Sequence, residues 1–459
     1  MNFKKMFLAI MAVAMMIGFA GSAFAACQSG TFIYGASAQY NFWKAQAPTF
    51  LTTNCGTAVA FSGSPAADTN SWIVVDTAGN WFAVANKASY DGICSIAGDP
   101  ASVAACALYA PTTCPPGQRN RPVFNGGGLT GALVCAPVTG GAADVQAATF
   151  SQITAGELNG PLGGGVISRD FTTNPLAGID AGVLDDYNPV VVPFAFYVNT
   201  SVKVTGIAGP GNGITETVPN LSTSQIKLLF SGQIKDWSDL GSYTDMDGTT
   251  WSFNAKQTVV CMRHAGSGTH ATLDVTQMTV PSTTGSSSLL EVENCSNFAG
   301  CDAGALNSGA HGASSWGFFF NDSTSGVLNC LGGSGTWGNN LGAVGYADAD
   351  KGVNPTGYGT PGSIQQVALN GVSANPNTIA ASIENGDYDF WTIENLYLPT
   401  GTPTAAGTWY GDLLRFAGSP ANRLDVAYAQ NCQMHYWKAF DTDPAYYRAS
   451  LPACPAFTR

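Results

Sequence analysis

The sequence is poor in charged residues, and the basic ones are the scarcer kind. Only 10% of its 459 residues are charged, and 18 Lys and Arg stand against 30 Asp and Glu, a net charge of −12. Nucleic-acid binding depends on many Lys and Arg that neutralise phosphates, so this balance argues against a nucleic-acid partner. It leaves room for a small anion that is held by backbone dipoles and one Arg.

Motifs typical of several enzyme and metal-binding classes are missing. No Cys-x-x-Cys pair occurs, so neither a zinc ribbon, a thioredoxin-type site nor covalent haem is indicated, and we expect no metal and no cofactor. No Gly-x-Ser-x-Gly elbow surrounds Ser267, and packed or solvated side chains are the simpler interpretation of the four His. We therefore expect no catalytic residues and a protein that is not an enzyme.

The first 25 residues have the pattern of a secretory signal. Lys4 and Lys5 precede an apolar stretch over residues 6–20, and Ala23-Phe24-Ala25 has the form of a cleavage site. We expect residues 1–25 to be a signal peptide and the mature chain to be periplasmic or extracellular. Lipid anchoring at Cys27 is left open.

Cysteine is plentiful, and all 12 copies lie beyond this segment. An even number of Cys in an exported chain indicates disulfides. The sequence alone leaves their connectivity open. Pairing between neighbours would join Cys27 to Cys55, Cys94 to Cys106, Cys114 to Cys135, Cys295 to Cys301 and Cys432 to Cys454, which leaves Cys261 for Cys330.

The most informative stretch begins at Arg263. It follows an apolar run at residues 258–262 that is typical of a buried strand, and it leads into a segment of helix-compatible composition. Gly268 lets the backbone approach a ligand, Ser267 and Thr269 add hydroxyls, and the helix start adds unpaired N–H groups. With the planar fork of Arg263, these residues form a candidate site for a tetrahedral oxyanion; a plain turn is the alternative.

Two similar strand and turn units stand near the N-terminus. A β-type run over residues 31–38 ends in small residues that include Ser37 and Ala38. The helix expected after it, over residues 40–51, contains Pro48, which favours an early end. A further strand at residues 57–61 leads into a hydroxyl-rich turn that contains Ser64.

The composition of residues 65–140 predicts an irregular insertion that disulfides cross-link, with strands near Ile73–Val75 and Trp81–Val84. Just beyond it, Asp144 lies among small residues. Its carboxylate would accept a hydrogen bond from a protonated ligand oxygen; a helix N-cap or turn is the alternative.

The second half of the chain carries further recognisable segments. Residues 189–199 form a continuous apolar run that predicts a buried strand, with a crossing between lobes as one interpretation. Ser222 and Gln225 predict a capping box, and Gly232 the end of that helix. The stretch from Cys432 to Cys454 predicts a helix that packs against the rest of the protein.

Several of these segments resemble the phosphate-binding proteins (PstS-like proteins) that serve phosphate ABC transporters. The resemblance covers roughly residues 190–399 and is weaker before residue 190. Residues 220–237 are similar to the family's "NLS…FSGKI.NW" segment, Arg263 with residues 266–269 to its "R..GSGT" ligand loop, Gly342–Tyr346 to "aIGY" and Leu369–Val372 to "lnGv". Gly35–Ala38, Gly63-Ser64 and Gly141–Asp144 are similar to "GAGAT", "GSG" and "GASD", with Ala143 where the family has Ser.

The resemblance implies an α/β fold, two-lobed and periplasmic-binding-protein-like (type II). It would have two crossing strands, at Tyr197–Thr200 and at about residues 389–398, and the Cys-rich insertion in lobe one. Lobe one would comprise residues 26–197, with the insertion at about 65–140, lobe two residues 198–388, and the return crossing and the rest of lobe one residues 389–459.

The resemblance also implies a function. An exported solute-binding protein would capture inorganic phosphate or a similar oxyanion between its lobes, as a monomer, for an ABC permease. Asp144 would accept the ligand proton and so exclude sulfate, and Arg263 would supply the one positive charge. The altered first loop and the insertion favour an alternative, an extracellular binding or adhesion protein with the same fold and a different ligand. The ligand set would be Ser37, Ala38, Ser64, Asp144, Arg263, Ser267, Gly268 and Thr269.

Overall fold

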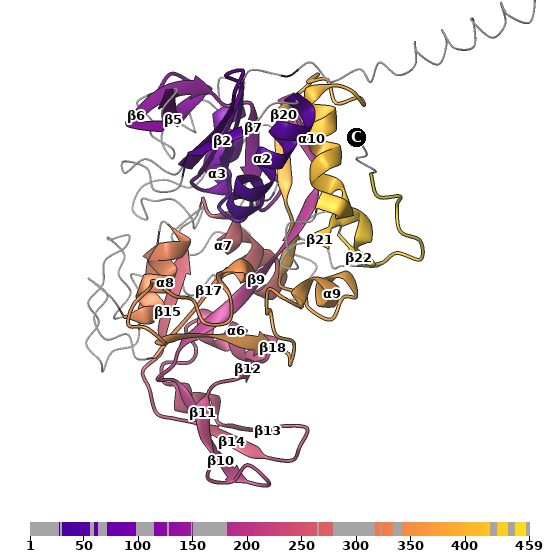
Figure 1. The fold of residues 1–459 in the computed structure, drawn as a ribbon. Coiled ribbons are helices and arrows are strands. Elements are labelled where there is room, and N and C mark those ends of the chain that lie inside the picture. The colour runs from indigo at the N-terminus through magenta and orange to yellow at the C-terminus, as the bar shows by residue number, and fades with distance from the viewer. Residues whose placement is uncertain are drawn as a thin grey trace, which may run out of the picture.

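A computed structural model describes residues 27, 30–55, 59–62, 71–97, 114–125, 128–147, 149, 181–263, 266–278, 317–321, 323–333, 342–422, 429–438 and 446–455. The predicted signal peptide and Ser64 lie outside these residues. Figure 1 shows two stacked bodies, which we call lobe one and lobe two, each built around one mixed sheet.

Lobe one contains a seven-stranded sheet in the order β2-β3-β4-β1-β7-β20-β8. Its central strand β1 runs parallel to both β4 and β7, and the remaining pairs are antiparallel. The strands are β1 (Thr31–Gly35), β2 (Val59–Ser62), β3 (Ser71–Asp76), β4 (Trp81–Asn86), β7 (Gly140–Ala143), β8 (Leu184–Tyr187) and β20 (Asn395–Pro399). The helices are α2 (Tyr40–Cys55), α3 (Ser89–Ile96) and α10 (Trp409–Gly418).

Lobe two contains a larger sheet in the order β12-β18-β9-β17-β15-β16. β9 is antiparallel to both neighbours, whereas β15 is parallel to β16 and β17. The strands are β9 (Val190–Asn199), β12 (Asn220–Leu221), β15 (Val259–Arg263), β16 (Gly317–Asn321), β17 (Ala343–Asp348) and β18 (Ile364–Leu369). The helices are α6 (Thr223–Phe230), α7 (Gly268–Leu273) with a π-helical turn at Asp274–Met278, α8 (Thr324–Gly332) and α9 (Ile379–Glu384).

The long strand β9 connects the two lobes. Its first residues pair with β19 (Trp391–Ile393) and β21 (Ala429–Gln430), and its second half pairs with β17 and β18. β20 begins two residues after β19 and lies in the lobe-one sheet, so the chain returns here. Tyr197, at the start of the expected first crossing, lies inside the lobe-two sheet, opposite Gly345 and Gln366. The domain boundaries themselves stay a prediction.

Smaller sheets complete the described chain. A four-stranded sheet projects from lobe two at the bottom of Figure 1, and a hairpin projects from lobe one at the top left. The four-stranded sheet comprises β10 (Lys203–Ala208), β11 (Thr215–Thr217), β13 (Ser242–Thr244) and β14 (Thr250–Phe253). The hairpin comprises β5 (Gln118–Asn125) and β6 (Gly128–Pro137). A third small sheet, a C-terminal ribbon, comprises β22 (Tyr436–Trp437) and β23 (Tyr446–Tyr447).

Local signals in the sequence explain several of these elements. Ser222 accepts from the Gln225 backbone N–H, and the Gln225 side chain accepts from the Ser222 backbone, so the predicted capping box is confirmed. Gly232 follows this helix with φ 74°, a conformation that favours glycine.

Three local predictions are wrong. Helix α2 continues through Pro48 to Cys55, because Trp43 and Phe50 are fully buried and hold it against the sheet. The insertion is more regular than expected, since it contains α3 and the hairpin β5–β6. The described part of the stretch from Cys432 to Cys454 is a short 3₁₀ turn and the ribbon β22–β23, not a helix.

Four of the described disulfides follow the neighbour pairing: Cys27–Cys55, Cys114–Cys135, Cys261–Cys330 and Cys432–Cys454. The Cys261–Cys330 bond ties β15 to α8 inside the core of lobe two, where both residues are fully buried. Within the described part of the chain, no helix combines the length and the apolar character needed to cross a membrane.

Candidate anion-binding site

Arg263 is the last residue of β15 and is 1% exposed. Its backbone N–H donates to the Tyr346 hydroxyl (2.9 Å), which fixes the strand end against β17. Its guanidinium Nη1 donates to Oγ1 of Thr324 (3.0 Å), the first residue of α8. The guanidinium is therefore held between a strand end and a helix start, where parallel sheets commonly bind ligands.

A polar cavity of about 300 Å³ opens beside Arg263, and both lobes contribute to its wall. Lobe one supplies Ser37 from the loop after β1, together with residues of α2 and of the end of β4. Lobe two supplies Arg263, the start of α8 and the segment after β17. The full lining is Ser37, Tyr40, Asn41, Asn86, Lys87, Arg263, Ser323, Thr324, Ser325, Asp348, Lys351 and Tyr358.

The start of α8 gives this cavity a positive end. Ser323 is the N-cap, and its hydroxyl accepts from the Gly326 N–H (3.0 Å). The helix dipole and the unpaired N–H groups of a first turn both favour an anion. Thr324 and Ser325 also carry hydroxyls, so this turn resembles the predicted loop at residues 266–269 in chemistry.

Two further cations line the cavity besides Arg263. Lys87 is exposed and follows β4, and Lys351 closes the 3₁₀ turn after β17. Lys351 Nζ lies 2.7 Å from Asp350 Oδ1 and 3.5 Å from Asp348 Oδ2, so its charge is largely compensated. Folding thus brings two distant Lys to the same wall as Arg263, and the expectation that Arg263 supplies the one positive charge to the ligand stays a prediction.

Asp348 is the one carboxylate in the lining, and its side chain is 1% exposed. Its Oδ2 is ion-paired with Lys351, and its Oδ1 accepts no hydrogen bond from the described residues. Burial raises the pKa of Asp348, and the nearby Lys351 charge opposes that rise. The cavity therefore presents a buried acceptor as well as cations.

Asp144 forms part of the contact between the lobes. Its Oδ2 accepts from the Thr269 hydroxyl (3.1 Å), its N–H donates to Oγ of Ser89 (3.0 Å), and its C=O accepts from Thr392 (2.6 Å). A Cβ added to Gly268 would lie 2.2 Å from Ser89 Oγ, so only glycine allows α7 to approach α3 this closely.

Burial raises the pKa of Asp144 to about 7, and the charge of Asp348 adds to the rise. The Thr269 hydroxyl and the Arg263 charge act in the opposite direction. Its Oδ1 accepts no hydrogen bond from the described residues. Near neutral pH this carboxyl can thus gain or lose a proton at little cost.

His270 supports Arg263 and is itself neutral. Its Nδ1 lies 2.6 Å from the Tyr346 hydroxyl, which already accepts the Arg263 N–H and so donates to the ring. Burial and the Arg263 charge lower the pKa of His270 to about 3. This His packs in the core and is no candidate base, as expected.

Two more contacts close the lobes over the cavity. Asn41 of α2 donates to Asp350, and the Tyr90 N–H donates to the Gly266 carbonyl (3.1 Å). The described arrangement is therefore a closed one, with lobe-one and lobe-two groups in direct contact around Arg263.

The predicted ligand residues separate into two groups in the structure. Ser37 and Arg263 line the cavity. Asp144, Gly268 and Thr269 are buried at the contact between the lobes, and Ala38 and Ser267 are buried outside the lining.

Sequence reasoning missed Ser89, Lys87, Asp348 and the start of α8. A hydroxyl at a helix start after a strand would have pointed to Ser89, and the Ser323–Ser325 run just before an apolar helix would have pointed to α8. No local pattern marks Asp348 or Lys87.

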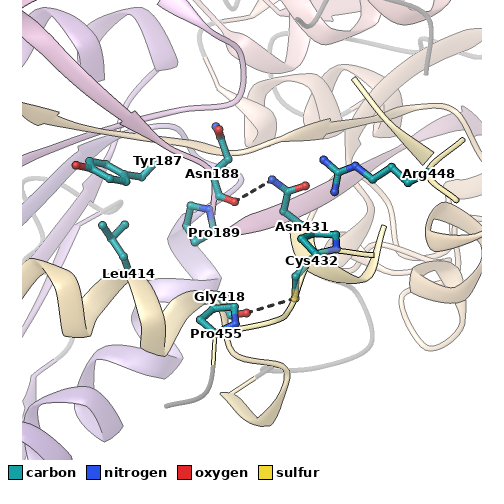
Figure 2. A pocket seen from close by; sticks show the side chains of 10 residues that line it. Tyr187, Asn188, Pro189, Leu414, Gly418, Asn431, Cys432, Arg448 and Pro455 are labelled. Atoms are coloured by element: carbon teal, nitrogen blue, oxygen red, sulfur yellow. Dashed lines mark hydrogen bonds between the residues drawn. The ribbon is translucent and has the colours of Figure 1, made fainter. Parts of the chain in front are cut away.

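A second cavity, of about 290 Å³, lies beneath the C-terminal segment (Figure 2). Prolines, Leu414 and the ring of Tyr187 make much of its wall. Its polar contacts are internal: Asn431 Nδ2 donates to the Asn188 carbonyl (3.3 Å), and Arg448 packs over the Trp437 ring at 4.6 Å.

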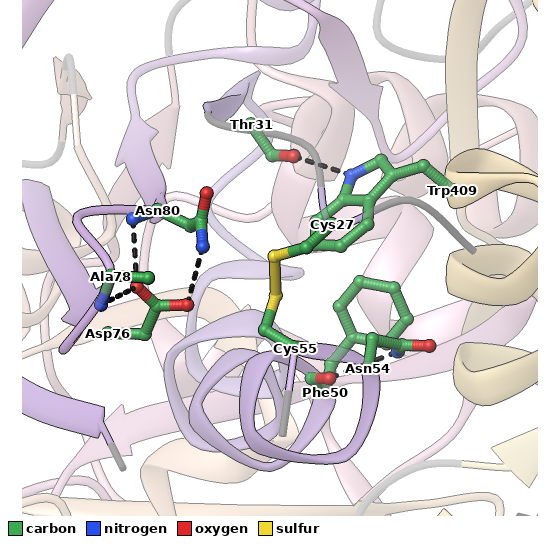
Figure 3. The surroundings of a disulfide bond; sticks show 9 residues. All are labelled: Cys27, Thr31, Phe50, Asn54, Cys55, Asp76, Ala78, Asn80 and Trp409. Carbon is green, nitrogen blue, oxygen red and sulfur yellow. Dashed lines mark hydrogen bonds between the residues drawn. A yellow bond between two sulfur atoms is a disulfide. The ribbon is translucent and has the colours of Figure 1, made fainter. Parts of the chain in front are cut away.

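No metal centre is supported among the described residues. The closest grouping of ligand-type atoms is Cys27, Cys55 and Asp76, but the two sulfurs are bonded to each other (Figure 3). Asp76 Oδ1 accepts from the backbone N–H groups of Ala78 and Asn80, as in an ordinary turn.

Comparison with known protein families gives one match. Residues 189–417 match the model of the PBP superfamily domain. Among curated proteins no relative is found.

The chain is also similar to solved structures. One is a putative phosphate ABC transporter substrate-binding protein with bound phosphate from Clostridium perfringens, at 14% identity and a TM-score of 0.39, covering 86% of this chain and 94% of that one. Another is an ABC-type phosphate transport receptor from Vibrio cholerae, at 11% identity and a TM-score of 0.37, covering 85% and 95%. A third is a phosphate-binding protein from Stenotrophomonas maltophilia, at 13% identity and a TM-score of 0.40, covering 85% of this chain and 83% of that one.

Proposed function

Because residues 189–417 belong to the PBP superfamily, we propose that this chain is an exported solute-binding protein that captures phosphate or a similar oxyanion between its lobes. The cavity beside Arg263 carries the proposal, since a buried guanidinium, the start of α8 and the hydroxyl-bearing loop at Ser37 converge there. The disulfides and the signal-like N-terminus favour a place outside the cytoplasm, and an ABC permease is the partner that such a protein would serve.

The contact groups have distinct roles in this proposal. Arg263 makes a paired contact to two anion oxygens, and Ser37 and the first turn of α8 donate further hydrogen bonds. Asp144 accepts the proton of a protonated ligand oxygen; because it does not line the cavity in the closed arrangement, its carboxyl turns from Thr269 toward the ligand on binding. Ser267, Gly268 and Thr269 position that carboxyl and bring the lobes together, and we place no catalytic step in the site.

Calorimetry on the exported protein tests this proposal. At pH 8, above the pKa of about 7 of Asp144, phosphate and arsenate should bind, and sulfate should bind at least tenfold more weakly, because a fully ionised oxyanion leaves the ionised Asp144 facing a like charge. Asp144→Asn should narrow that difference, since an amide can donate as well as accept. Sulfate that binds wild type as tightly as phosphate does would contradict the role of Asp144, and no heat with any oxyanion would contradict the function.

A further inference from the structure

The interlobe cavity is larger than an inorganic oxyanion requires. Its volume of about 300 Å³ lies at the lower end of the ~300–1,000 Å³ range of small-molecule pockets. Phosphate has five heavy atoms, and Arg263 with the start of α8 occupies only one part of the wall. The remaining wall is therefore available to a group attached to the anion.

That remaining wall offers acceptors that a bare phosphate cannot use. Asp348 and Asn86 belong to the lining, and the Oδ1 atoms of both accept no hydrogen bond from the described residues, whereas Asp348 Oδ2 is ion-paired with Lys351 (3.5 Å). Burying unpaired acceptors costs free energy, and an ionised oxyanion has no hydrogen to give them. Ligand hydroxyl groups supply such hydrogens, and a hydroxyl that donates to a carboxylate forms a charge-assisted bond.

Aromatic and charged groups agree with a polyhydroxylated ligand. Tyr40 enters the lining from lobe one and Tyr358 from lobe two, so two amphipathic rings can cover the C–H faces of an organic group. The positive charge is limited to Arg263 and the exposed Lys87, because Lys351 is already paired with Asp350 and Asp348. One phosphoryl group with a neutral polar remainder therefore matches the cavity better than a chain of phosphates.

We propose that the cavity takes a phosphate monoester of a polyhydroxy compound, of the glycerol phosphate or sugar phosphate class. The phosphoryl group lies against Arg263, Ser37 and the start of α8, and the hydroxyl groups donate to Asp348 and Asn86. This inference rests on the proposed capture of an oxyanion, which it narrows to a class of ligand.

Titration calorimetry with a matched series of ligands tests the inference on the unaltered protein. The probes are inorganic phosphate, glycerol 3-phosphate, glucose 1-phosphate, n-propyl phosphate and 2-aminoethylphosphonate. Glycerol 3-phosphate or glucose 1-phosphate should bind at least tenfold more tightly than n-propyl phosphate, which has the same charge and no hydroxyl, and more tightly than phosphate itself.

The failures are distinguishable. If phosphate binds and the hydroxylated esters bind no better than n-propyl phosphate, the inference is wrong and the proposed function stands. Tighter binding of 2-aminoethylphosphonate would assign the acceptors to an amine instead and overturn the hydroxyl assignment. If no probe binds, the proposed function itself is wrong.

Variants of Asp348 give a second measurement. Asp348→Leu should lower the affinity for the hydroxylated ester at least tenfold, while the affinity for n-propyl phosphate changes no more than twofold. Asp348→Asn should have an affinity for the hydroxylated ester between those of wild type and Asp348→Leu. Near-ultraviolet circular dichroism checks that each variant is folded. Equal losses for both ligands in a folded variant would contradict the contact between Asp348 and a ligand hydroxyl.

Discussion

The interlobe cavity and the cavity beneath the C-terminal segment enclose about 300 and 290 Å³, yet their walls differ. The first has groups from both lobes, three cations, a buried carboxylate and a helix start. The second has prolines, Leu414 and one Arg, Arg448 (Figure 2). This Arg stacks on Trp437. Volume alone therefore does not single out a candidate ligand site in this protein; the convergence of charged and polar groups from separate elements does.

A disulfide stands close to each cavity, and this makes the comparison testable. Cys261 lies two residues before Arg263, and its partner Cys330 lies in α8, so this bond fixes two elements of the candidate site to each other. Cys432 lines the second cavity directly and pairs with Cys454. Breaking each bond should have separate consequences for stability and for binding.

The largest effect is expected from removal of the Cys261–Cys330 bond. The double variant Cys261→Ala with Cys330→Ala should lose about 4 kcal/mol of unfolding free energy, as the chain-entropy relation gives for a 69-residue separation, and ligand affinity should fall with it. The matched control, Cys432→Ala with Cys454→Ala, should lose about 3 kcal/mol and keep its affinity. Denaturant unfolding and calorimetry measure both. Equal affinity losses in the two variants would show that ligand binding does not depend on the interlobe cavity more than on the second cavity.

Arg263→Ala should weaken oxyanion binding by about ten- to a hundredfold, because charge-assisted hydrogen bonds are worth roughly 1.5–3 kcal/mol. Arg263→Lys should recover only part, since a point charge cannot make the paired contact. Arg448→Ala in the second cavity is the control and should leave the affinity unchanged. Calorimetry measures the affinity. If a folded Arg263→Ala protein binds the oxyanion as tightly as wild type does, the ligand does not bind in this cavity.

Gly268→Ala should hinder closure of the lobes. The new Cβ would lie 2.2 Å from Ser89 Oγ and 2.7 Å from Asp144 Cβ, so the lobes must separate or strain by about 1–3 kcal/mol. Affinity should fall about tenfold, and small-angle scattering with saturating ligand should show a larger radius of gyration than for wild type. Adding Ser89→Gly should restore part of the affinity. Unchanged affinity and radius would show that closure does not depend on this contact.

The smallest effect concerns the pH dependence of stability. The pKa of Asp144 is about 7 in the folded protein against 3.8 as the ordinary value, so the folded state binds the proton more tightly. The contribution of this group is therefore most favourable below about pH 4 and is lost as pH rises through 7. Asp144→Asn should gain stability relative to wild type between pH 5 and pH 8, by on the order of 1–3 kcal/mol. Parallel thermal-unfolding curves against pH would contradict the raised pKa.

The sequence by itself determined those features that depend on neighbours in the chain. The strand before Arg263, the capping box at Ser222 and the position of Gly232 follow from local periodicity and turn chemistry. The order of the Cys along the chain suggested the four described disulfides, three between neighbours and Cys261–Cys330 as the remaining pair, but only the fold fixed this connectivity. The match over residues 189–417 confirms the superfamily that the motifs indicated.

Tertiary structure decided the composition of the candidate site. Ser37, Lys87, Arg263 and Asp348 are separated by long stretches of sequence, and the crossing of the chain through β9 and β19–β20 brings them to one wall. The same packing moved Asp144 and Thr269 into the contact between the lobes and let α2 run through Pro48. Burial against distant elements outweighs local preference at these positions, because removing large side chains from water contributes more than one turn or one proline costs.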